Sequence, residues 1–452
     1  MKIAFVASCL FVCAIGAPVY AQQNYQSQQF PLPVLRGGGH TVLPHSGVES
    51  SEDIGVRAHT NFKLFVPSGR DQYGFAEGDV HANGTAADTA SPITGYYAET
   101  PASLGCLYGL SHAVPYCNPA TLSNSNDAGG GSKAIAIVDA YDYPTALNDL
   151  KAFSSNFGLP GPNSSTFTVT WAGSKPSPDP ACALVDGWQC WAVESATDIE
   201  MVHSAAPHAH IYLVEAASNS FTDLFAAVAK AVTLVKAAGG GEVSMSWGGS
   251  EWSSETSEDY RFNQGKVVMF AATGDVEGTE YPSTSPNVVA VGGTTITRSP
   301  YTLDFEQETT WEDGGGGVSS YEPLPPYQKN LASELPGRGV PDVAADANPR
   351  TGVWVYDSYM NTYGGVLQPW NTVGGTSVST PLWAGIVNHG GSFSATSAAE
   401  LSLIYNTAAS GSYTRDYRDI TYGTCGYYDG WYAQTGWDPC TGNGSSIGQT
   451  GK

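Results

Sequence analysis

The sequence predicts an α/β protein of three layers, in which a parallel sheet carries helices on both faces. Apolar runs of strand length, such as residues 134–138, contain no polar side chain, which is typical of strands buried on both faces. These runs alternate with longer segments of helical spacing, such as residues 221–237, and the alternation favours right-handed βαβ units. A segment of about 350 residues can bury a substantial core within one domain.

The predicted elements follow this alternation from residue 96 onward. Residues 22–95 are polar and rich in Gly and Pro, and we expect one strand among them, at 56–66. We expect helices at 143–157, 191–205, 221–237 and 253–262. We expect strands at 134–138, 167–171, 210–214, 242–247, 267–271, 288–291 and 353–356.

Residues 1–21 have the features of a secretory signal peptide. Lys2 precedes an apolar stretch at 3–16, and small residues around Ala21 offer a cleavage site. The apolar stretch is too short to span a membrane. We therefore expect an exported protein, extracellular or periplasmic, that does not associate with membranes. Residues 22–95 are then a leader or a short pro-segment, and residues 96–452 form the main domain.

The cysteines point to the same kind of compartment. Of 8 cysteines, Cys9 and Cys13 lie in the predicted signal peptide. The other six fall into three pairs that are local in sequence, which suggests three short-loop disulfides in an oxidising environment. The pairs are Cys106 with Cys117, Cys182 with Cys190, and Cys425 with Cys440. No C-x-x-C spacing occurs, so a metal–thiolate centre is not favoured.

The charge balance argues against a nucleic-acid partner. The chain carries 19 basic and 42 acidic residues, a net charge of −23 at pH 7, and such a surface repels phosphate backbones. In acid the carboxylates are protonated and few cations remain to repel one another, so the composition suits function at low pH.

One serine near the C-terminal end is a candidate nucleophile. A Gly-Gly-Thr-Ser block runs from Gly374 to Ser377, and Pro381 precedes the apolar run 382–387. Glycines permit a tight turn and proline is favourable in a first helical turn, so we expect a loop, the serine and then a buried helix. Backbone N–H groups converge there and stabilise negative charge, as attack by a nucleophile requires. The alternative is that Ser377 only caps the helix.

The predicted helix 191–205 carries a pair of carboxyls. Glu194 and Asp198 are four residues apart, so they share one face, and their neighbours are apolar or small. Two like charges on one face repel each other, which favours the protonated form of one of them. This cost suggests a functional pair, although a lone E-x-x-x-D pattern is usually a solvated face.

Together with Ser377, this pair resembles the site of the sedolisin family of serine-carboxyl peptidases, which have a subtilisin-like fold. Further blocks resemble the family in the same order along the chain, from about residue 100 to 445. They are residues 244–248, 271–275, 281–283, 291–294, 341–345, 419–420 and 436–439.

The resemblance implies a role for each matching residue. Ser377 is the nucleophile, Glu194 its general base, Asp198 the carboxyl that supports Glu194, and Asp275 the oxyanion-hole donor. The strand that binds substrate is expected to contribute Ser244, Ser246, Trp247 and Gly248.

These roles imply an enzyme that works in acid. An ordinary carboxyl side chain has a pKa of roughly 4, so it serves as a base near that pH or when its pKa is raised. Asp275 must be neutral to donate a hydrogen bond to an oxyanion, whereas a histidine base is protonated in acid. We therefore expect a secreted, acid-acting endopeptidase that forms an acyl-enzyme on Ser377, acts on proteins or peptides, and is a monomer.

The family also binds calcium near its C-terminus. The matching positions are Asp419, Ile420, Gln434, Gly436 and Asp438. Two carboxylates and backbone carbonyls suit one Ca²⁺ ion. The family usually has glycine where Gln434 stands, but a carbonyl ligand does not depend on the side chain. The alternative is an ordinary turn rich in Asp and Gly.

Other interpretations of the sequence stay open. Within the family, a tripeptidyl-type exopeptidase is the alternative to an endopeptidase, and an inactive binding relative is a second one. A subtilisin-type enzyme would instead use Asp139 and His203, but no His-Gly-Thr-His block is present. Sedolisins typically carry a long folded propeptide, and residues 22–95 are short for that role, which leaves autocatalytic maturation open.

Overall fold

The computed structural model describes residues 38–67, 91–93, 96–111, 115–122, 130–183, 190–331, 335–359, 369–426 and 430–448. All of these belong to one compact unit, Pro33–Lys452. The predicted signal peptide and part of the predicted leader lie outside the described residues.

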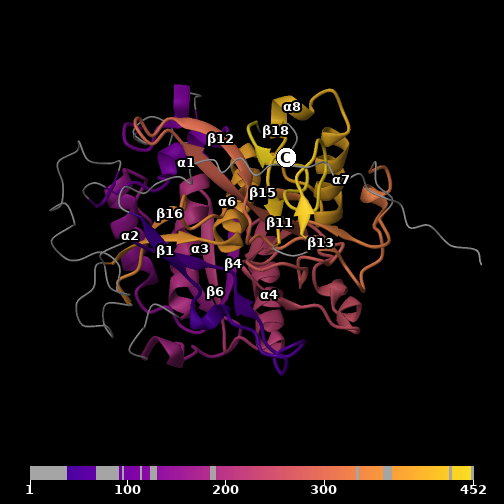
Figure 1. The fold of residues 1–452 in the computed structure, drawn as a ribbon. Coiled ribbons are helices and arrows are strands. Elements are labelled where there is room, and N and C mark those ends of the chain that lie inside the picture. The colour runs from indigo at the N-terminus through magenta and orange to yellow at the C-terminus, as the bar shows by residue number, and fades with distance from the viewer. Residues whose placement is uncertain are drawn as a thin grey trace, which may run out of the picture. The chain divides into compact units, whose positions relative to one another are not determined.

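The central sheet has eight strands and confirms the predicted fold class (Figure 1). Its order is β12-β11-β9-β7-β4-β6-β5, with β15 also paired to β11. Every described pairing is parallel except that of β12 with β11. The strands are β4 (Ala134–Ala140), β5 (Phe167–Trp171), β6 (His210–Ala216), β7 (Gly241–Met245), β9 (Val267–Ala272), β11 (Val289–Arg298), β12 (Phe305–Thr310) and β15 (Val343–Asp346).

Helices cover both faces of this sheet, because alternate residues of each strand point to opposite sides. On β4, Ala136 and Val138 belong to the core under α4 (Phe221–Ala237). Ile135 and Ile137 belong to the core on the other face. Among the helices that contribute to that second core are α2 (Ala146–Phe157), α3 (Trp191–Ala205) and α6 (Thr376–Gly390).

Smaller elements surround these layers. The further helices among the described residues are α1 (Pro101–Leu107), α7 (Ser397–Ala408) and α8 (Tyr413–Asp416). The 3₁₀ turns are His45–Gly47, Pro115–Cys117, Pro180–Ala183, Glu255–Ser257, Asp259–Arg261 and Pro326–Gln328. Three two-stranded ladders pair β13 (Gly317–Val318) with β14 (Gly339–Val340), β18 (Tyr417–Arg418) with β21 (Ser445–Ser446), and β19 (Thr424–Cys425) with β20 (Trp431–Tyr432).

The N-terminal segment forms sheets with strands from far along the chain. A four-stranded sheet has the order β1 (Gly39–Val42), β3 (Lys63–Pro67), β17 (Trp370–Gly374) and β16 (Val353–Tyr356). A three-stranded sheet has the order β10 (Glu280–Tyr281), β8 (Trp247–Ser250) and β2 (His59–Thr60). Residues 38–67 are therefore integrated into the same unit as the predicted main domain.

The helices α3 and α6 cross at very close range. A Cβ atom built on Gly385 of α6 would lie 2.5 Å from the Cβ atom of Ala205 in α3. Only glycine at this crossing allows the two helix backbones to approach so closely. The two elements that carry the candidate base and nucleophile are therefore packed directly against each other.

Four local predictions need correction. The expected helix 253–262 is two short 3₁₀ turns, because its polar residues, of low helix propensity, have no apolar face to bury. The expected strand 56–66 is broken between β2 and β3. The expected strand 242–247 divides into β7 and β8. Pro381 lies inside α6, beyond its first turn. The strand β17, which leads into the nucleophile block, was not predicted.

All three expected disulfides are present. Cys106 is bonded to Cys117, Cys182 to Cys190, and Cys425 to Cys440. None of the helices in the described part of the chain combines the length and apolar character needed to cross a bilayer.

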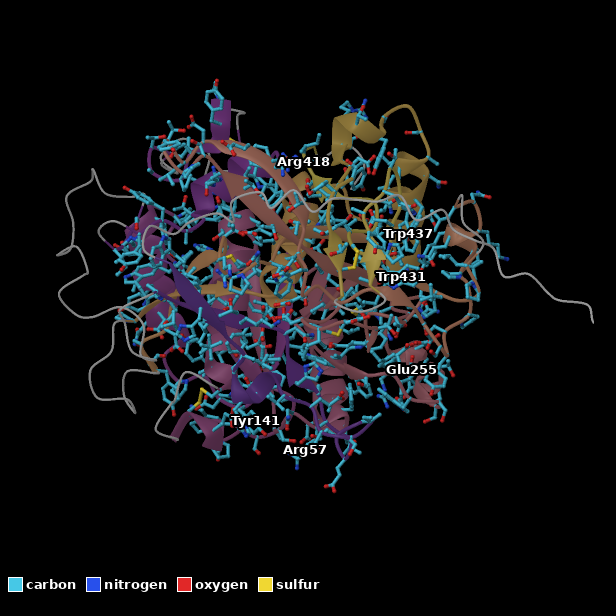
Figure 2. All side chains as sticks on the ribbon, in the orientation of Figure 1. Arg57, Tyr141, Glu255, Arg418, Trp431 and Trp437 are labelled. Atoms are coloured by element: carbon cyan, nitrogen blue, oxygen red, sulfur yellow. A yellow bond between two sulfur atoms is a disulfide. The ribbon has the colours of Figure 1, made fainter. Side chains whose placement is uncertain are left out.

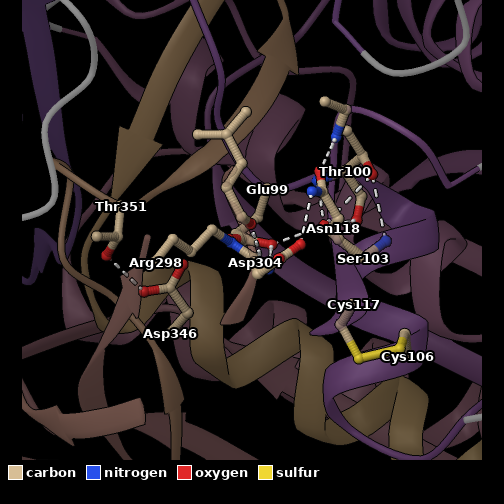
Figure 3. A network of polar contacts seen from close by, with 12 residues as sticks. Glu99, Thr100, Ser103, Cys106, Cys117, Asn118, Arg298, Asp304, Asp346 and Thr351 are labelled. Atoms are coloured by element: carbon tan, nitrogen blue, oxygen red, sulfur yellow. Dashed lines mark hydrogen bonds and ion pairs between the residues drawn. A yellow bond between two sulfur atoms is a disulfide. The ribbon is translucent and has the colours of Figure 1, made fainter. Parts of the chain in front are cut away.

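Arginines neutralise several buried carboxylates away from the candidate site. Figure 3 shows Arg298 paired with Glu99 next to the Thr100–Ser103 capping box of α1. The Nη2 atom of Arg298 donates to Glu99 Oε2 at 2.7 Å. Arg338 forms a bidentate ion pair with Asp342, and both side chains are fully buried. The Arg298–Glu99 pair links two segments that are 199 residues apart, whereas Arg338 and Asp342 are four residues apart.

Candidate active site

The candidate nucleophile lies in the first turn of α6, directly after β17. Gly375 joins the two elements with a φ of 111°, which other residues rarely adopt. Ser377 is completely buried, and its Oγ atom donates a hydrogen bond to the carbonyl of Ser246 at 3.0 Å. The tight turn therefore places the hydroxyl against the strand that the sequence predicts to bind substrate.

The candidate base, Glu194, lies in the first turn of α3. Cys190, which is held by a disulfide, caps this helix at its N-terminus. The Glu194 carboxyl is fully buried and forms no hydrogen bond shorter than 3.5 Å within the described part of the chain. Burial and the nearby carboxyls of Asp198 and Asp139 raise the pKa of Glu194 well above its usual value, and the Ser377 hydroxyl opposes this shift.

The second carboxyl of α3, Asp198, faces the same site. Its Oδ1 atom accepts a hydrogen bond from the Ser246 hydroxyl at 2.7 Å. Burial and the charge of Asp139 raise the pKa of Asp198 well above its usual value. Ser246 thus contacts both Asp198 and Ser377, the former through its hydroxyl and the latter through its carbonyl.

A third buried carboxyl, Asp139, belongs to this cluster. It lies near the end of β4, and burial raises its pKa to about 7. The sequence placed Asp139 only in the subtilisin-type alternative, although its position after the first buried strand was a usable signal. His203, the histidine of the subtilisin-type alternative, does not join the carboxyl cluster. Its Nε2 atom lies 2.8 Å from the carbonyl oxygen of Pro160. Burial lowers the pKa of His203 to about 4.

The candidate oxyanion donor, Asp275, follows β9 and reaches the start of α6. Its Oδ1 atom accepts hydrogen bonds from Thr376, from the backbone N–H at 2.8 Å and from the hydroxyl at 3.0 Å. No hydrogen bond within the described residues uses its Oδ2 atom. Burial raises the pKa of Asp275 to about 7, against the opposing effects of Lys63 and Thr376. In acid this carboxyl is therefore neutral, with a proton available on Oδ2.

The expected substrate-binding residues lie in the consecutive strands β7 and β8 and in the residue between them. Ser244 is on β7, Ser246 lies between the strands, and Trp247 and Gly248 begin β8. The indole of Trp247 is fully buried and donates to the carbonyl of Val138 at 2.7 Å. The side chain of Trp247 is therefore part of the core that includes α4.

The expected calcium residues meet in one C-terminal loop region, which the Cys425–Cys440 disulfide closes. Asp438 Oδ1 accepts from the N–H groups of Cys440 and Thr441 at 2.8 and 2.9 Å. Asp419 Oδ1 accepts from the N–H of Gly436 at 3.1 Å. Trp437, labelled in Figure 2, follows Gly436 and donates its indole N–H to Pro341.

The donor set of this loop fits a hard cation. Within the described residues, no hydrogen bond uses the carbonyl oxygens of Ile420, Gln434 or Gly436. Burial raises the pKa of Asp438 to about 7, as expected for a carboxylate without a counter-charge. Three free carbonyls and two carboxylates are the type of ligand that Ca²⁺ prefers. The one described cluster of three His, Cys, Asp or Glu side chains is Asp179 with Cys182 and Cys190, whose sulfurs are joined in a disulfide.

Comparisons with known proteins agree with this geometry. A family model described as the Subtilase family matches residues 190–423. Kumamolisin of Bacillus sp. (strain MN-32) is 32% identical over 359 residues, which cover 71% of this chain and 59% of kumamolisin. Sedolisin of Pseudomonas sp. (strain 101) is 27% identical over 371 residues, which cover 73% of this chain and 59% of sedolisin. The chain thus spans 59% of the length of each of these relatives.

A solved structure supports the fold. The structure of Pseudomonas sedolisin, a serine-carboxyl proteinase complexed with two molecules of pseudo-iodotyrostatin, aligns with a TM-score of 0.59 at 23% sequence identity. The alignment covers 77% of this chain and 95% of that chain. At this identity the match shows a shared fold.

Proposed function

This chain belongs to the subtilase family and resembles its sedolisin members, and on that basis we propose that it is a serine-carboxyl peptidase that hydrolyses proteins or peptides in acid. One observation carries the proposal: the buried pair Glu194 and Asp198 faces Ser377 with no arginine or histidine bonded to it within the described residues. Such a pair provides a base at a pH where imidazole is protonated.

The proposed reaction begins at the Ser377 hydroxyl. Glu194 takes the hydroxyl proton while Oγ attacks the carbonyl carbon of the peptide bond. The oxyanion that forms is stabilised by the proton on Asp275 Oδ2 and by the N–H of Ser377. Glu194 then returns the proton to the leaving amine, the C–N bond breaks, and water hydrolyses the acyl ester by the same steps.

Asp198 and Asp139 set the protonation of Glu194. The carboxyls of Glu194 and Asp198 interact strongly, so they titrate jointly and share a proton. The hydrogen bond from Ser246 holds Asp198 in place and favours its charged form. The role of Asp198 is therefore to keep one proton and one negative charge available next to Ser377.

A pH–rate profile tests the proposal. We expect hydrolysis of a mixed peptide library to peak in acid and to fall as Asp275 loses its proton near pH 7. Ser377→Ala should reduce kcat by about 10⁶-fold, as for other serine nucleophiles, whereas Ser402→Ala, on the outer face of α7, is a matched control. Mass spectrometry of the products separates an endopeptidase from an exopeptidase. A rate that rises toward neutral pH, or full activity in Ser377→Ala, would contradict the mechanism.

We also propose that the C-terminal loop binds one Ca²⁺ through Asp419 and Asp438 and the carbonyls of Ile420, Gln434 and Gly436. The bound ion would stabilise the loop without taking part in the reaction. A ligand that binds only the folded state stabilises it by about 2.7 kcal/mol at 100 times its Kd. Calorimetry should therefore show that a chelator lowers the Tm of the wild type but leaves that of Asp438→Asn unchanged. An unchanged Tm in the wild type would count against the ion.

The three disulfides support export to an oxidising compartment. We propose a secreted monomer. Electrophoresis of the non-reduced protein from culture medium or periplasm tests its location, and light scattering tests its oligomeric state.

A further inference from the structure

Four acidic side chains lie together beyond the end of β8, the strand that we expect to bind substrate. Glu251 follows β8 directly, and Glu255 and Asp259 belong to the two 3₁₀ turns after it. Glu322 comes from a different segment, between β13 and β14. We call these four residues the acid cluster, of which Glu255 is labelled in Figure 2. None of them takes part in the reaction proposed above.

Glu251 connects β8 to two neighbouring segments. Its carboxylate accepts a hydrogen bond at 2.6 Å from the hydroxyl of Thr279, the residue before β10, and β10 is paired with β8. The same carboxylate accepts from the Ser319 hydroxyl and, at 3.3 Å, from the backbone N–H of Ser320. Glu251 therefore holds the end of β8 against the segment that follows β13.

The four carboxyls of the acid cluster form two contacting pairs. The carboxyl of Glu251 is hydrogen-bonded to that of Glu255. The carboxyl of Asp259 is hydrogen-bonded to that of Glu322. An ionised carboxylate can only accept hydrogen bonds, so two carboxyls bond to each other only when one of them carries a proton. Each pair therefore shares a proton in this arrangement.

Glu322 shows most directly that a proton is needed. It is 2% exposed, and within the described residues no N–H or hydroxyl group donates to either of its carboxyl oxygens. Arg338, the cation that faces it, already forms the bidentate ion pair with Asp342. Nor do three carboxyls of the acid cluster converge on one point in the described part of the chain, as ligands of a cation do. The proton shared with Asp259 is therefore what satisfies Glu322.

Burial and the neighbouring carboxyls keep protons on the acid cluster. Burial and the contact with Glu251 raise the pKa of Glu255 to about 9. Burial and the charge of Asp259 raise the pKa of Glu322 to about 8. The titratable or charged groups that face the cluster from neighbouring elements are Tyr281, Tyr327 and Arg338.

We propose that the acid cluster positions the substrate strand, and that the protons shared within its two pairs hold β8 to the segment that follows β13. The pair of Asp259 and Glu322 bridges the two segments directly. Glu255 holds Glu251 in place to accept from the Ser319 hydroxyl. When the shared protons leave, two negative charges face each other in each pair and the segments separate. The effect on substrate binding rests on the proposed function, whereas the pairs themselves do not.

The direction of the pH effect follows from the raised pKa values of Glu255 and Glu322. In the opened form these carboxyls are solvated and have an ordinary pKa of roughly 4. The closed form is therefore fully favoured below about pH 4 and is lost as pH rises toward the folded values. Between these limits each shared proton makes opening about tenfold more favourable per pH unit.

Hydrogen exchange at several pH values tests the inference. The full chain with Ser377→Ala excludes self-digestion, and the exchange rates are corrected for the intrinsic pH dependence of amide exchange. From about pH 5 to pH 7, exchange in residues 251–259 and 319–322 should rise by at least about tenfold, while exchange in α7 stays constant. A corrected rate that does not change with pH in these two segments would overturn the proposal.

A double substitution replaces the shared protons. In Glu255→Gln with Glu322→Gln, an amide N–H stands where each carboxyl proton was, so the two hydrogen bonds no longer depend on pH. Exchange in both segments should then stay within about twofold over the same pH range. The matched control, Glu306→Gln on the surface, should keep the rise of the parent chain. An equal rise in the double variant and the control would show that the shared protons do not hold the segments together.

Kinetics separates this positioning role from the chemistry. In the active enzyme, KM for a long peptide should rise at the pH where exchange shows that the segments open, but not in the double variant, whereas kcat should fall in both as Asp275 titrates. Protection of residues 319–322 by added Ca²⁺ at pH 7 would show a bound cation in place of the proton and would overturn the proposal. The expected exchange in a chain that hydrolyses no peptide would support the acid pairs and contradict only the proposed function.

Discussion

Two groups of buried carboxyls in this chain have opposite surroundings. Glu99, Asp342 and Glu308 are each paired with an arginine: Arg298, Arg338 and Arg418. Glu194, Asp198, Asp139 and Asp275 are equally buried, but within the described residues no arginine contacts them. Their partners are hydroxyl and backbone N–H groups, or none.

This difference separates structural carboxyls from those we propose to be catalytic. A buried carboxylate with a bidentate arginine is neutralised, and loss of either partner exposes the other to a large desolvation cost. A buried carboxyl without a cation keeps its proton instead, so its pKa rises toward the pH at which proton transfer is useful. The paired group holds the fold together, and the unpaired group stores the capacity for acid–base chemistry.

Removal of an unpaired carboxyl should abolish activity and spare the fold. Glu194→Gln is expected to reduce kcat/KM by about 10²–10⁴-fold, the usual contribution of a general base. Its free energy of unfolding should not fall, because the substitution removes a group that is costly to bury. Kinetics and denaturant unfolding measure the two quantities. A large decrease in the free energy of unfolding of Glu194→Gln would show that Glu194 has a structural role, like the carboxyls paired with arginine.

Removal of a paired arginine should have the opposite result. Arg298→Met leaves Glu99 buried without its cation, with the Ser103 hydroxyl as a remaining donor, and removal of one partner from a buried ion pair typically costs about 3–5 kcal/mol of stability. The kcat/KM of the molecules that remain folded should be unchanged. Lys151→Met is the control, because this lysine is exposed and its loss should not change stability measurably. Unaltered stability in Arg298→Met would show that the Glu99 pair is not structural.

The unpaired group should make the fold acid-stable. The pKa values of Asp139 and Asp275, two members of this group, are raised to about 7. A raised pKa in the folded state means that stability is fully present below the unfolded pKa of roughly 4 and is lost as pH rises through the folded value. The free energy of unfolding should fall by roughly 1 kcal/mol per pH unit or more between these limits. Greater stability at pH 8 than at pH 4 would contradict the shifts.

The smallest effect is expected at the oxyanion position. Asp275→Asn keeps an oxygen for the two Thr376 donors and provides an N–H donor at every pH. We expect its rate in acid to stay within about tenfold of the wild type, and the decline near pH 7 to move to higher pH. Comparison of the two pH–rate profiles tests this. If the rate of Asp275→Asn falls at the same pH as that of the wild type, the fall is caused by the titration of another group.

Much of this architecture was predictable because its signals are local. Apolar runs such as 134–138 identify buried strands wherever they occur, and the i, i+4 spacing of Glu194 and Asp198 places them on one face of any helix. The Gly-Gly-Thr-Ser block likewise specifies its own turn. These features depend on neighbouring residues only.

The features that were missed depend on distant residues. Nothing in the sequence near Asn61 indicates that Thr60 will lie opposite Trp247, which is 187 residues further along the chain. Nor does it indicate that the backbone N–H of Ser377, which is still more distant, will donate a hydrogen bond to the Asn61 carbonyl. Asp139 joins the carboxyl cluster only when β4 and α3 pack together. The expected helix 253–262 did not form for a local reason, because its polar sequence has too few apolar side chains to build a buried helix face.

The close contact of Gly385 with Ala205 has a consequence for how such a molecule can diversify. Two helices that meet backbone to backbone move as one rigid body, so the reacting groups mounted on them keep their spacing whatever happens in the surrounding loops. The loops around them can then change in sequence and length while the spacing between Glu194 and Ser377 is kept.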